Sequence, residues 1–74
     1  MKYIRDEKGI KLLGKRIREL RKKQKISQVQ LAFEAGIPQK QVSRIERGDI
    51  NTGVSTIFAI ANALDVHPKE LFDF

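Results

Sequence analysis

Apolar residues recur at helical spacing along most of this chain. Leu13, Ile17 and Leu20 follow one another at intervals of four and three residues, which is typical of one face of an amphipathic helix. Residues 54–64 carry an apolar arc wide enough for a central core helix. Nowhere do apolar and polar residues alternate as they do in a half-buried strand. The sequence therefore predicts an all-α fold.

Two shorter apolar stripes lie between these segments, over residues 28–35 and 38–47. Ser27 is suited to cap the first, and Gly36 to end it in the left-handed conformation that costs other residues more. Pro38 fits the first position of the next helix, where its missing N–H does no harm. We thus predict two short helices joined by a tight turn, with the second held outward as a rigid rod.

The remaining boundaries complete a prediction of five helices. Gly48 is expected to end the third helix, and Asn51 or Thr52 to cap the fourth. His67 precedes a proline and is expected to cap a short fifth helix that carries Leu71.

Residues 1–10 show no clear period and include a helix breaker, Gly9. They are predicted to form an N-terminal tail or arm, which leaves residues 11–74 as one domain. A chain of 74 residues buries only roughly 60% of the surface that it exposes when unfolded, so little room is left for an enzyme cleft. Function is therefore expected on the outer surface.

The net charge of +6 is unevenly distributed. Residues 1–25 contain eleven Lys and Arg against three acids, a balance of +8, whereas residues 26–74 contain four against six, a balance of −2. Such asymmetry favours a polyanionic partner. For residues 21–25 alone, a solvated lysine-rich face explains the charge equally well. The further basic residues on the helix predicted over residues 38–47 favour nucleic acid as that partner.

Composition excludes several other kinds of site. The chain has no cysteine and one histidine, so we expect no disulfide framework, no metal site and no cofactor. No segment approaches the ~20 apolar residues of a membrane span, and the first residues lack the apolar run of a signal peptide. We expect a cytoplasmic protein that has no membrane partner and is not an enzyme.

Several motifs resemble the helix-turn-helix domain of phage-repressor and Cro-like proteins, often called XRE-like. The similar text is IRELRKKQKISQVQLAFEAGIPQKQVSRIERG followed by STIFAIANALDVHPKELF, and the resemblance covers residues 12–72. It implies a compact five-helix bundle of the lambda-repressor-like type, whose second and third helices form the helix-turn-helix. It also implies that the recognition helix, residues 38–47, enters the major groove of double-stranded DNA.

The side chains on the outer face of that helix can all hydrogen-bond to DNA. The resemblance implies base contacts from Gln39, Lys40 and Arg44, with Gln41 and Ser43 as secondary candidates. The chemistry agrees, because Gln pairs bidentately with adenine, and Lys or Arg with guanine. An ordinary solvated helix face is the alternative for these residues.

Phosphate contacts are implied at the edges of the same surface. The resemblance assigns them to Gln28 and Arg47, and to the backbone N–H groups of the loop that contains Asn51, Thr52 and Gly53. For Gln28 the alternative is support of a helix start without DNA.

The resemblance also implies a structural ion pair and shows two departures from the family. The family pairs an arginine late in helix one with a glutamate late in helix three, here Arg21 and Glu46, and a partly buried pair is expected. Pro38 stands where the family often has serine, so the third helix loses a side-chain cap. Phe33 occupies a position that is usually polar.

The function predicted from these features is a sequence-specific DNA-binding transcriptional regulator, of repressor type, which acts by occupying its operator as a homodimer. One recognition helix contacts only a few base pairs, so two half-sites are the usual remedy. The alternative is a protein-interaction adaptor of the same fold, antitoxin-like or coactivator-like. Its partner would bind exposed Phe33, Phe74 and the arm around Tyr3-Ile4.

Overall fold

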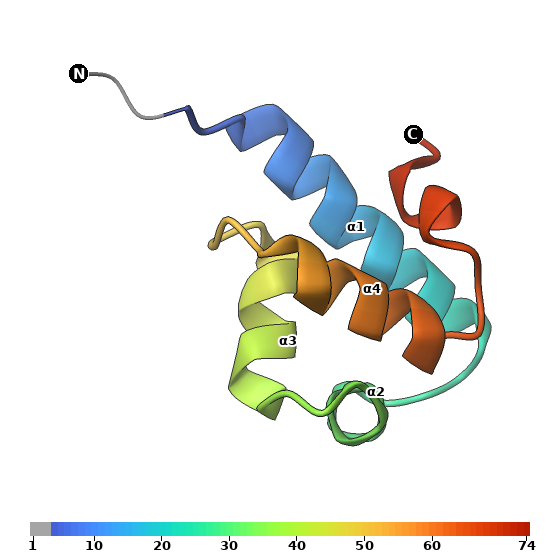
Figure 1. Ribbon diagram of the computed structural model, residues 1–74. Coiled ribbons are helices and arrows are strands. Elements are labelled where there is room, and N and C mark those ends of the chain that lie inside the picture. Colours follow the sequence, from blue (N-terminus) through green and yellow to red (C-terminus); the bar gives the residue numbers. More distant parts are fainter. Residues whose placement is uncertain (1–3) are drawn as a thin grey trace.

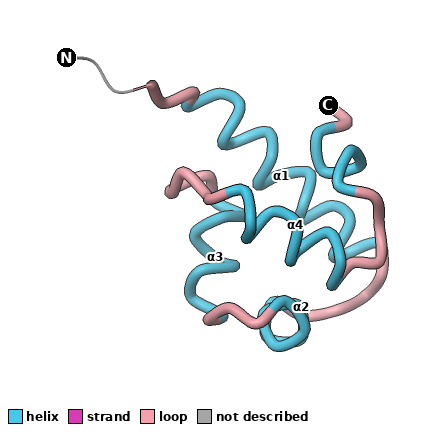
Figure 2. The backbone as a smooth tube through the Cα atoms, in the orientation of Figure 1, coloured by secondary structure: helices cyan, strands magenta, loops and turns pink. Residues whose placement is uncertain are grey.

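Four α-helices and one short 3-10 helix make up the computed structural model, which describes residues 4–74 (Figure 1). The elements are α1 (Glu7–Lys23), α2 (Gln28–Ala35), α3 (Gln39–Arg47), α4 (Val54–Ala63) and the 3-10 helix η1 (Pro68–Phe72). Residues 4–74 contain no strand (Figure 2). The prediction of an all-α fold is confirmed.

The prediction of five α-helices is wrong at the C-terminal end. The last element is a 3-10 helix of five residues, in which the N–H of Glu70 donates to the carbonyl of His67 at 2.9 Å. So short a segment does not sustain the hydrogen-bond ladder that stabilises an α-helix. Its cap is the predicted one, because Nδ1 of His67 accepts from the N–H of Lys69 at 3.1 Å.

α1 begins at Glu7, so the predicted tail of residues 1–10 is too long. The Asp6 carboxylate accepts a hydrogen bond from the N–H of Gly9 at 2.8 Å and so caps the helix. This cap satisfies an N–H that would otherwise lack a partner, which explains why Gly9 lies inside the first turn instead of breaking the helix. Residues 1–3, including Tyr3 of the predicted arm, lie outside the described residues.

The turn between α2 and α3 has the predicted geometry. Ser27 Oγ accepts from the N–H of Gln30 at 3.0 Å, and Gly36 ends α2 in the left-handed conformation with φ of 73°. Pro38 differs from the prediction by one position, since it precedes α3 as its cap residue with extended backbone. In Figure 1 α3 stands upright and α2 is seen end on, so the two helices cross steeply.

The start of α4 also differs from the prediction. Gly53, and neither Asn51 nor Thr52, is the cap residue, and no side chain hydrogen-bonds to the first turn of this helix. Gly48 ends α3 as predicted, again with a left-handed φ of 73°.

The core lies where α1, α2, α3 and α4 meet, and η1 closes it at one end. The buried apolar side chains come from all five elements and from the residue that ends α4: Ile17, Leu20, Leu31, Ala32, Val42, Ile45, Ile57, Ile60, Ala61, Leu64 and Leu71. α1 packs against α3 and η1, and α4 packs against α2 and η1. The outer face of α3 takes no part in this packing and remains in solvent.

Gly14 allows α1 to approach the last turn of α3 unusually closely. A Cβ atom at this position would lie 2.2 Å from the carbonyl oxygen of Ile45 and 2.9 Å from that of Glu46. The pattern of apolar residues did not single out Gly14, although it lies on the buried face of α1. This close contact sets the distance between α1 and the last turn of α3.

Candidate nucleic-acid interface

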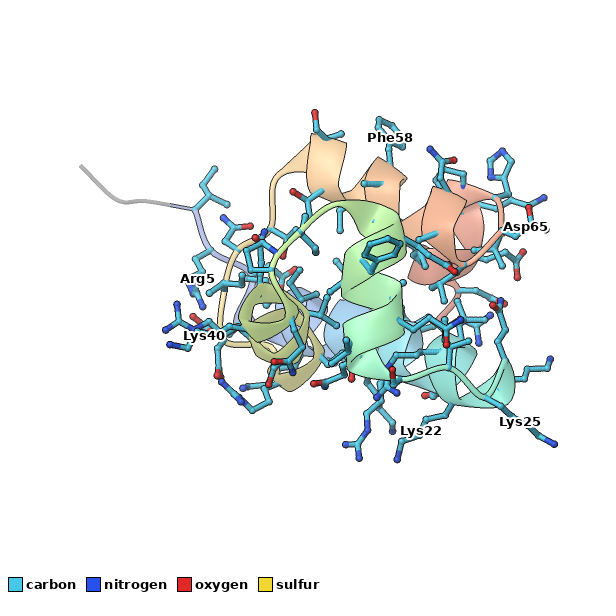
Figure 3. The ribbon with its side chains drawn as sticks, turned by 90° about the horizontal axis from the view of Figure 1, so that it is seen from below. Arg5, Lys22, Lys25, Lys40, Phe58 and Asp65 are labelled. Atoms are coloured by element: carbon cyan, nitrogen blue, oxygen red, sulfur yellow. The ribbon has the colours of Figure 1, made fainter. Side chains whose placement is uncertain are left out.

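The outer face of α3 gathers the side chains that the sequence predicted for contacts with bases. Gln39, Lys40 and Arg44 are exposed, whereas Gln41 and Ser43 are half-buried. Figure 3 shows Lys40 projecting from one edge of the molecule. The structure therefore places all five on one accessible helix, with the three primary candidates the most accessible.

A shallow hollow of about 310 Å³ lies beside this face. Lys40, Gln41 and Arg44 line it together with Pro38 and Ile50. Ile50 adds an apolar surface next to two cations, and sequence reasoning missed it because a single apolar residue in a polar loop has no period. A hollow of this composition suits the mixed polar and methyl edge that a base pair presents in the major groove.

The ion pair between Arg21 and Glu46 is present and buried. Nε of Arg21 donates to Oε2 of Glu46 at 2.7 Å, and Nη2 donates to Oε1 at 3.0 Å. The two side chains are only 10% and 3% exposed, and Nη1 of Arg21 also donates to the carbonyl of Ile26 at 2.9 Å. The hydrogen bond with Glu46 raises the pKa of Arg21 above its usual value. This bidentate pair joins α1 to α3.

Two amides extend that ion pair to the surface, forming what we call the amide relay (Glu46, Gln28 and Gln39). Nε2 of Gln28 donates to Oε1 of Glu46 at 3.0 Å, and Nε2 of Gln39 donates to Oε1 of Gln28 at 2.8 Å. A carboxylate only accepts, so Gln28 must turn its NH₂ group to Glu46 and its oxygen to Gln39. The orientation of the exposed Gln39 amide thus follows from a buried charge.

Arg47 is held at the other end of α3 by two neighbours. Its Nε donates to Oδ2 of Asp49 at 2.8 Å, and its Nη1 donates to Oγ of Ser43 at 2.9 Å. The hydrogen bond from Arg47 holds the pKa of Asp49 below its usual value, and the charges of Lys11 and Arg44 act in the same direction. The guanidinium therefore lies along the outer face of α3, with its charge partly compensated.

The N-termini of α3 and α4 lack side-chain caps, unlike those of α1 and α2. Pro38 has no side-chain acceptor, and Gly53 has no side chain. Asn51, Thr52 and Gly53 form the loop before α4, and Asn51 and Gly53 are exposed. Free N–H groups at a helix start carry partial positive charge and attract anions.

Within residues 4–74, no three side chains of the His, Cys, Asp or Glu types are grouped so that they could hold a metal ion. The single histidine, His67, is engaged in capping η1. In the same part of the chain, no helix has the length and apolarity needed to cross a membrane.

The fold and this surface define a helix-turn-helix protein. A model of the helix-turn-helix family matches residues 17–71, which is most of the chain, and the chain belongs to that family. The identification made from the quoted motifs is confirmed.

The chain is similar to two curated relatives and to one solved structure that we describe in turn. The control protein C.BamHI of Bacillus amyloliquefaciens is 42% identical over 64 residues, covering 85% of this chain and 79% of the relative. The immunity repressor protein of Bacillus phage phi105 is 41% identical over 54 residues, but the match spans only 38% of that longer protein. The crystal structure of the restriction-modification controller protein C.AhdI from Aeromonas hydrophila superposes with a TM-score of 0.84 at 41% identity, covering 85% of this chain and 96% of the other.

These relatives are repressors and controllers, in line with the family. The predictions of a DNA-binding transcriptional regulator and of a protein that is not an enzyme are confirmed by the family and by these relatives. The individual roles of the residues on α3 remain predictions.

Proposed function

We propose that α3 enters the major groove of double-stranded DNA and that Gln39, Lys40 and Arg44 contact base edges there. The observation that carries this proposal is the amide relay, which orients an exposed glutamine from a buried ion pair. A purely solvated helix face has no need of such a chain. Gln41 and Ser43 lie on the same helix and add secondary contacts.

The relay favours adenine opposite Gln39. One N–H of its Nε2 is engaged with Gln28, which leaves the second N–H and Oε1 free to face the groove. A donor beside an acceptor is the pattern that matches N7 and the N6 amino group of adenine. Lys40 and Arg44 carry only donors and favour guanine, whose O6 and N7 are both acceptors.

Contacts with the phosphate backbone would flank these base contacts. Arg47 is exposed at the end of α3, and the loop before the uncapped start of α4 offers the backbone N–H groups of Asn51, Thr52 and Gly53. Gln28 has a second N–H on its Nε2 besides the one given to Glu46, and this group contacts a phosphate in our proposal. Such contacts fix position and orientation without selecting sequence.

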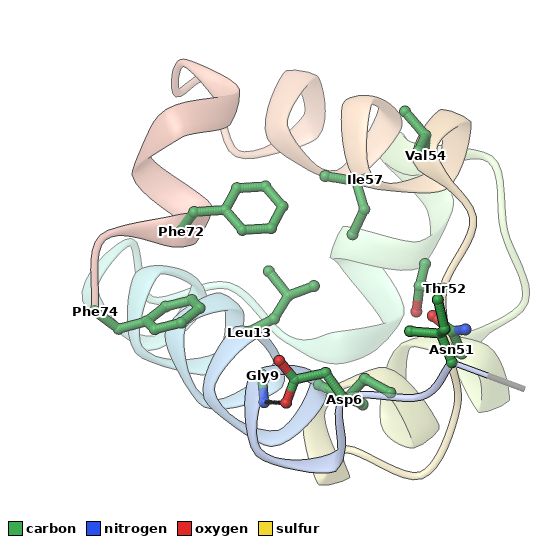
Figure 4. Close-up of a pocket in the computed structure, with 11 residues that line it drawn as sticks. Asp6, Gly9, Leu13, Asn51, Thr52, Val54, Ile57, Phe72 and Phe74 are labelled. Carbon is green, nitrogen blue, oxygen red and sulfur yellow. Dashed lines mark hydrogen bonds between the residues drawn. The ribbon is translucent and has the colours of Figure 1, made fainter. Parts of the chain in front are cut away.

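We further propose that the protein binds as a homodimer to a two-fold site. An open apolar groove of about 530 Å³ lies between the start of α1, the start of α4 and the C-terminal segment (Figure 4). Phe72 and Phe74 contribute rings whose centres are 6.5 Å apart, and both are more than half exposed. An exposed apolar surface of this kind favours a partner, and a second copy would cover it isologously.

Selection of bound duplexes from a random pool tests the main proposal. A motif with two inverted half-sites about 10 base pairs apart is expected, with adenine and guanine at the contacted positions. Gln28→Ala should relax the choice of base opposite Gln39 and leave the bases opposite Lys40 and Arg44 unchanged. Binding with no base preference, or equal loss of preference at every position, would argue against these roles.

Sedimentation equilibrium tests the dimer. Phe74→Asp should produce a monomer at concentrations where the parent protein is a dimer, and it should weaken binding to the two-fold site far more than to one half-site. A parent protein that is monomeric on DNA would exclude this arrangement.

The exposed side chain of Phe33 supports a second candidate function, that of a protein-interaction adaptor. Phe33 on α2 is 86% exposed, although the family usually has a polar residue there, and such a side chain suits a protein partner. Phe33→Ser should then abolish capture of a specific protein without changing DNA affinity. In either role we propose a cytoplasmic protein.

A further inference from the structure

The first residues of the described chain lie against the end of the recognition helix. Arg5 precedes α1, and its Nη2 donates to the backbone carbonyl of Asp49 at 3.1 Å. The side-chain carboxylate of Asp49 accepts a second hydrogen bond, from Nε of Arg47 at 2.8 Å. One residue in the loop after α3 thus holds two arginines that are 42 positions apart in sequence.

Lys11 lies against the same corner. A Cβ atom at Gly48 would be 2.6 Å from Cγ of Lys11 and 2.9 Å from its Cα, so the lysine stem lies directly over the end of α3. Both Lys11 and Arg44 are exposed, and the charges of both lower the pKa of Asp49. The positive charge of Lys11 therefore favours the ionised form of the Asp49 carboxyl group.

We call three of these cations, Arg5, Lys11 and Arg47, the basic corner, whereas Arg44 belongs to the neighbouring face of α3 that we propose contacts bases. We propose that the basic corner binds the phosphate backbone of DNA, with Arg5 and Lys11 extending the contact beyond the helix-turn-helix, and that Asp49 occupies the place of a phosphate in the free protein. The inference rests on the proposed function, in which the neighbouring face of α3 lies in the major groove.

The exposure of these ion pairs distinguishes the basic corner from a structural network. Arg47 and Asp49 have side chains 60% and 48% exposed, and Arg5, which also pairs with Glu7, has one 40% exposed. Exposed pairs of this kind contribute little to stability, so exchanging a carboxylate for a phosphate costs little. The buried pair between Arg21 and Glu46 is the opposite case and is not available for such an exchange.

The position of the basic corner is continuous with the proposed interface. A chain of hydrogen bonds runs from Ser43 on α3 through Arg47 and Asp49 to Arg5. Figure 3 shows Arg5 and Lys40 at the same edge of the molecule, whereas Lys22 and Lys25 lie at the other end of α1. The basic excess of the N-terminal third is therefore divided between two places, and only one of them adjoins the outer face of α3.

Binding measured across salt concentration tests the inference. The probes are the duplex selected by the protein and a random duplex of equal length, between 50 and 200 mM salt. Arg5→Gln/Lys11→Gln should make the slope of log K against log salt shallower by about 1–2, because each lost phosphate contact accounts for about 0.9. Both duplexes should lose affinity by the same factor, and the selected motif should not change.

The matched control removes two charges near the opposite end of α1, where Lys22 lies in the last turn and Lys25 follows the helix. Lys22→Gln/Lys25→Gln should alter the salt slope much less than the first variant, and circular dichroism should show both variants folded. If the two variants change the slope equally, net charge alone explains the effect and the basic corner is not a site. An unchanged slope in Arg5→Gln/Lys11→Gln also overturns it.

Asp49→Asn should change DNA affinity in the opposite direction. Removing the carboxylate that competes with phosphate should tighten binding to both duplexes by about three- to ten-fold. Equal or weaker binding would contradict the role of Asp49. Should the parent protein bind no duplex at all, the proposed function itself would fail, whereas normal binding with insensitive variants would refute the basic corner alone.

Discussion

Replacement of Gly14 by alanine is the most direct test of how α1 is mounted on α3. The new Cβ would lie 2.2 Å from the carbonyl oxygen of Ile45, whereas ordinary contact begins at 3.4 Å. The two helices would therefore have to separate by about 1.2 Å. Because the obstructing atom belongs to the backbone, no rotation of a side chain relieves the contact.

Two effects of opposite sign determine the size of the change. Alanine is favoured over glycine in a helix interior by about 1 kcal/mol. Overpacking of a well-packed site costs about 1–3 kcal/mol and occasionally more, and a backbone obstacle belongs at the upper end of that range. We expect Gly14→Ala to lower the free energy of unfolding by about 2 kcal/mol, which corresponds to a fall of roughly 8–16 °C in Tm for a domain of this size.

Urea and thermal unfolding followed by circular dichroism measure this change. Gly9→Ala is the matched control, because its Cβ would meet only the Asp6 carboxyl group, at 3.1 Å, and that side chain is exposed. Because alanine is favoured over glycine in a helix and the Asp6 side chain can adjust, the control should lose no more than about 0.5 kcal/mol relative to the parent protein. If Gly14→Ala proved as stable as Gly9→Ala, the close approach of α1 to α3 would be refuted.

Three further predictions concern the charged and polar side chains. Glu46→Ala leaves a buried guanidinium without its partner and should lower the free energy of unfolding in denaturant by about 3–5 kcal/mol. Arg47→Ala breaks an exposed pair and should lower it by less than about 1 kcal/mol. Equal losses of stability would contradict the difference in burial between the two pairs. Lys40→Ala and Arg44→Ala should change the bases selected from a random pool, while Arg47→Ala should weaken binding to all sequences alike. If all three variants weakened binding to every sequence equally, the division between base contacts and phosphate contacts would be wrong. Because Arg47 lowers the pKa of Asp49, their pairing is complete above the ordinary pKa of aspartate and is lost as pH falls through the lower value. A carboxyl NMR titration should therefore give Asp49 a lower midpoint in the parent protein than in Arg47→Ala, and equal midpoints would count against the pairing.

Local signals in the sequence were sufficient for most of the fold. Ser27 and Gly36 mark the ends of α2 because a hydroxyl cap and a left-handed glycine act on their own turn. Where two local signals compete, the prediction fails. Gly9 disfavours a helix, but the carboxylate of Asp6 caps the first turn and prevails. The last helix is η1 because its five residues offer too few hydrogen bonds for an α-helix.

Within the candidate site, too, the features set by local sequence were predicted and those set by contacts between helices were not. The spacing along α3 placed Lys40 and Arg44 on the outer face, because one helical period determines which side chains turn outward. The amide relay was not predicted, since it depends on how closely α2 and α3 approach each other. Gly14 and Arg5 were missed for the same reason, as each acts through residues more than 30 positions away.

The amide relay has a consequence for how this protein could acquire a new target. Gln39 shares its hydrogen bond with Gln28, and Gln28 shares another with the buried Glu46, so a change at any one of them disturbs the others. Lys40 and Arg44 have no such ties within the described chain. Divergence of binding preference should therefore begin at these two positions, where substitutions are nearly neutral for folding. If Gln39 contacts a base as we propose, single substitutions in the relay would relax the choice of that base, and a switch to a different base would need paired substitutions, so this position of the target sequence should change most slowly.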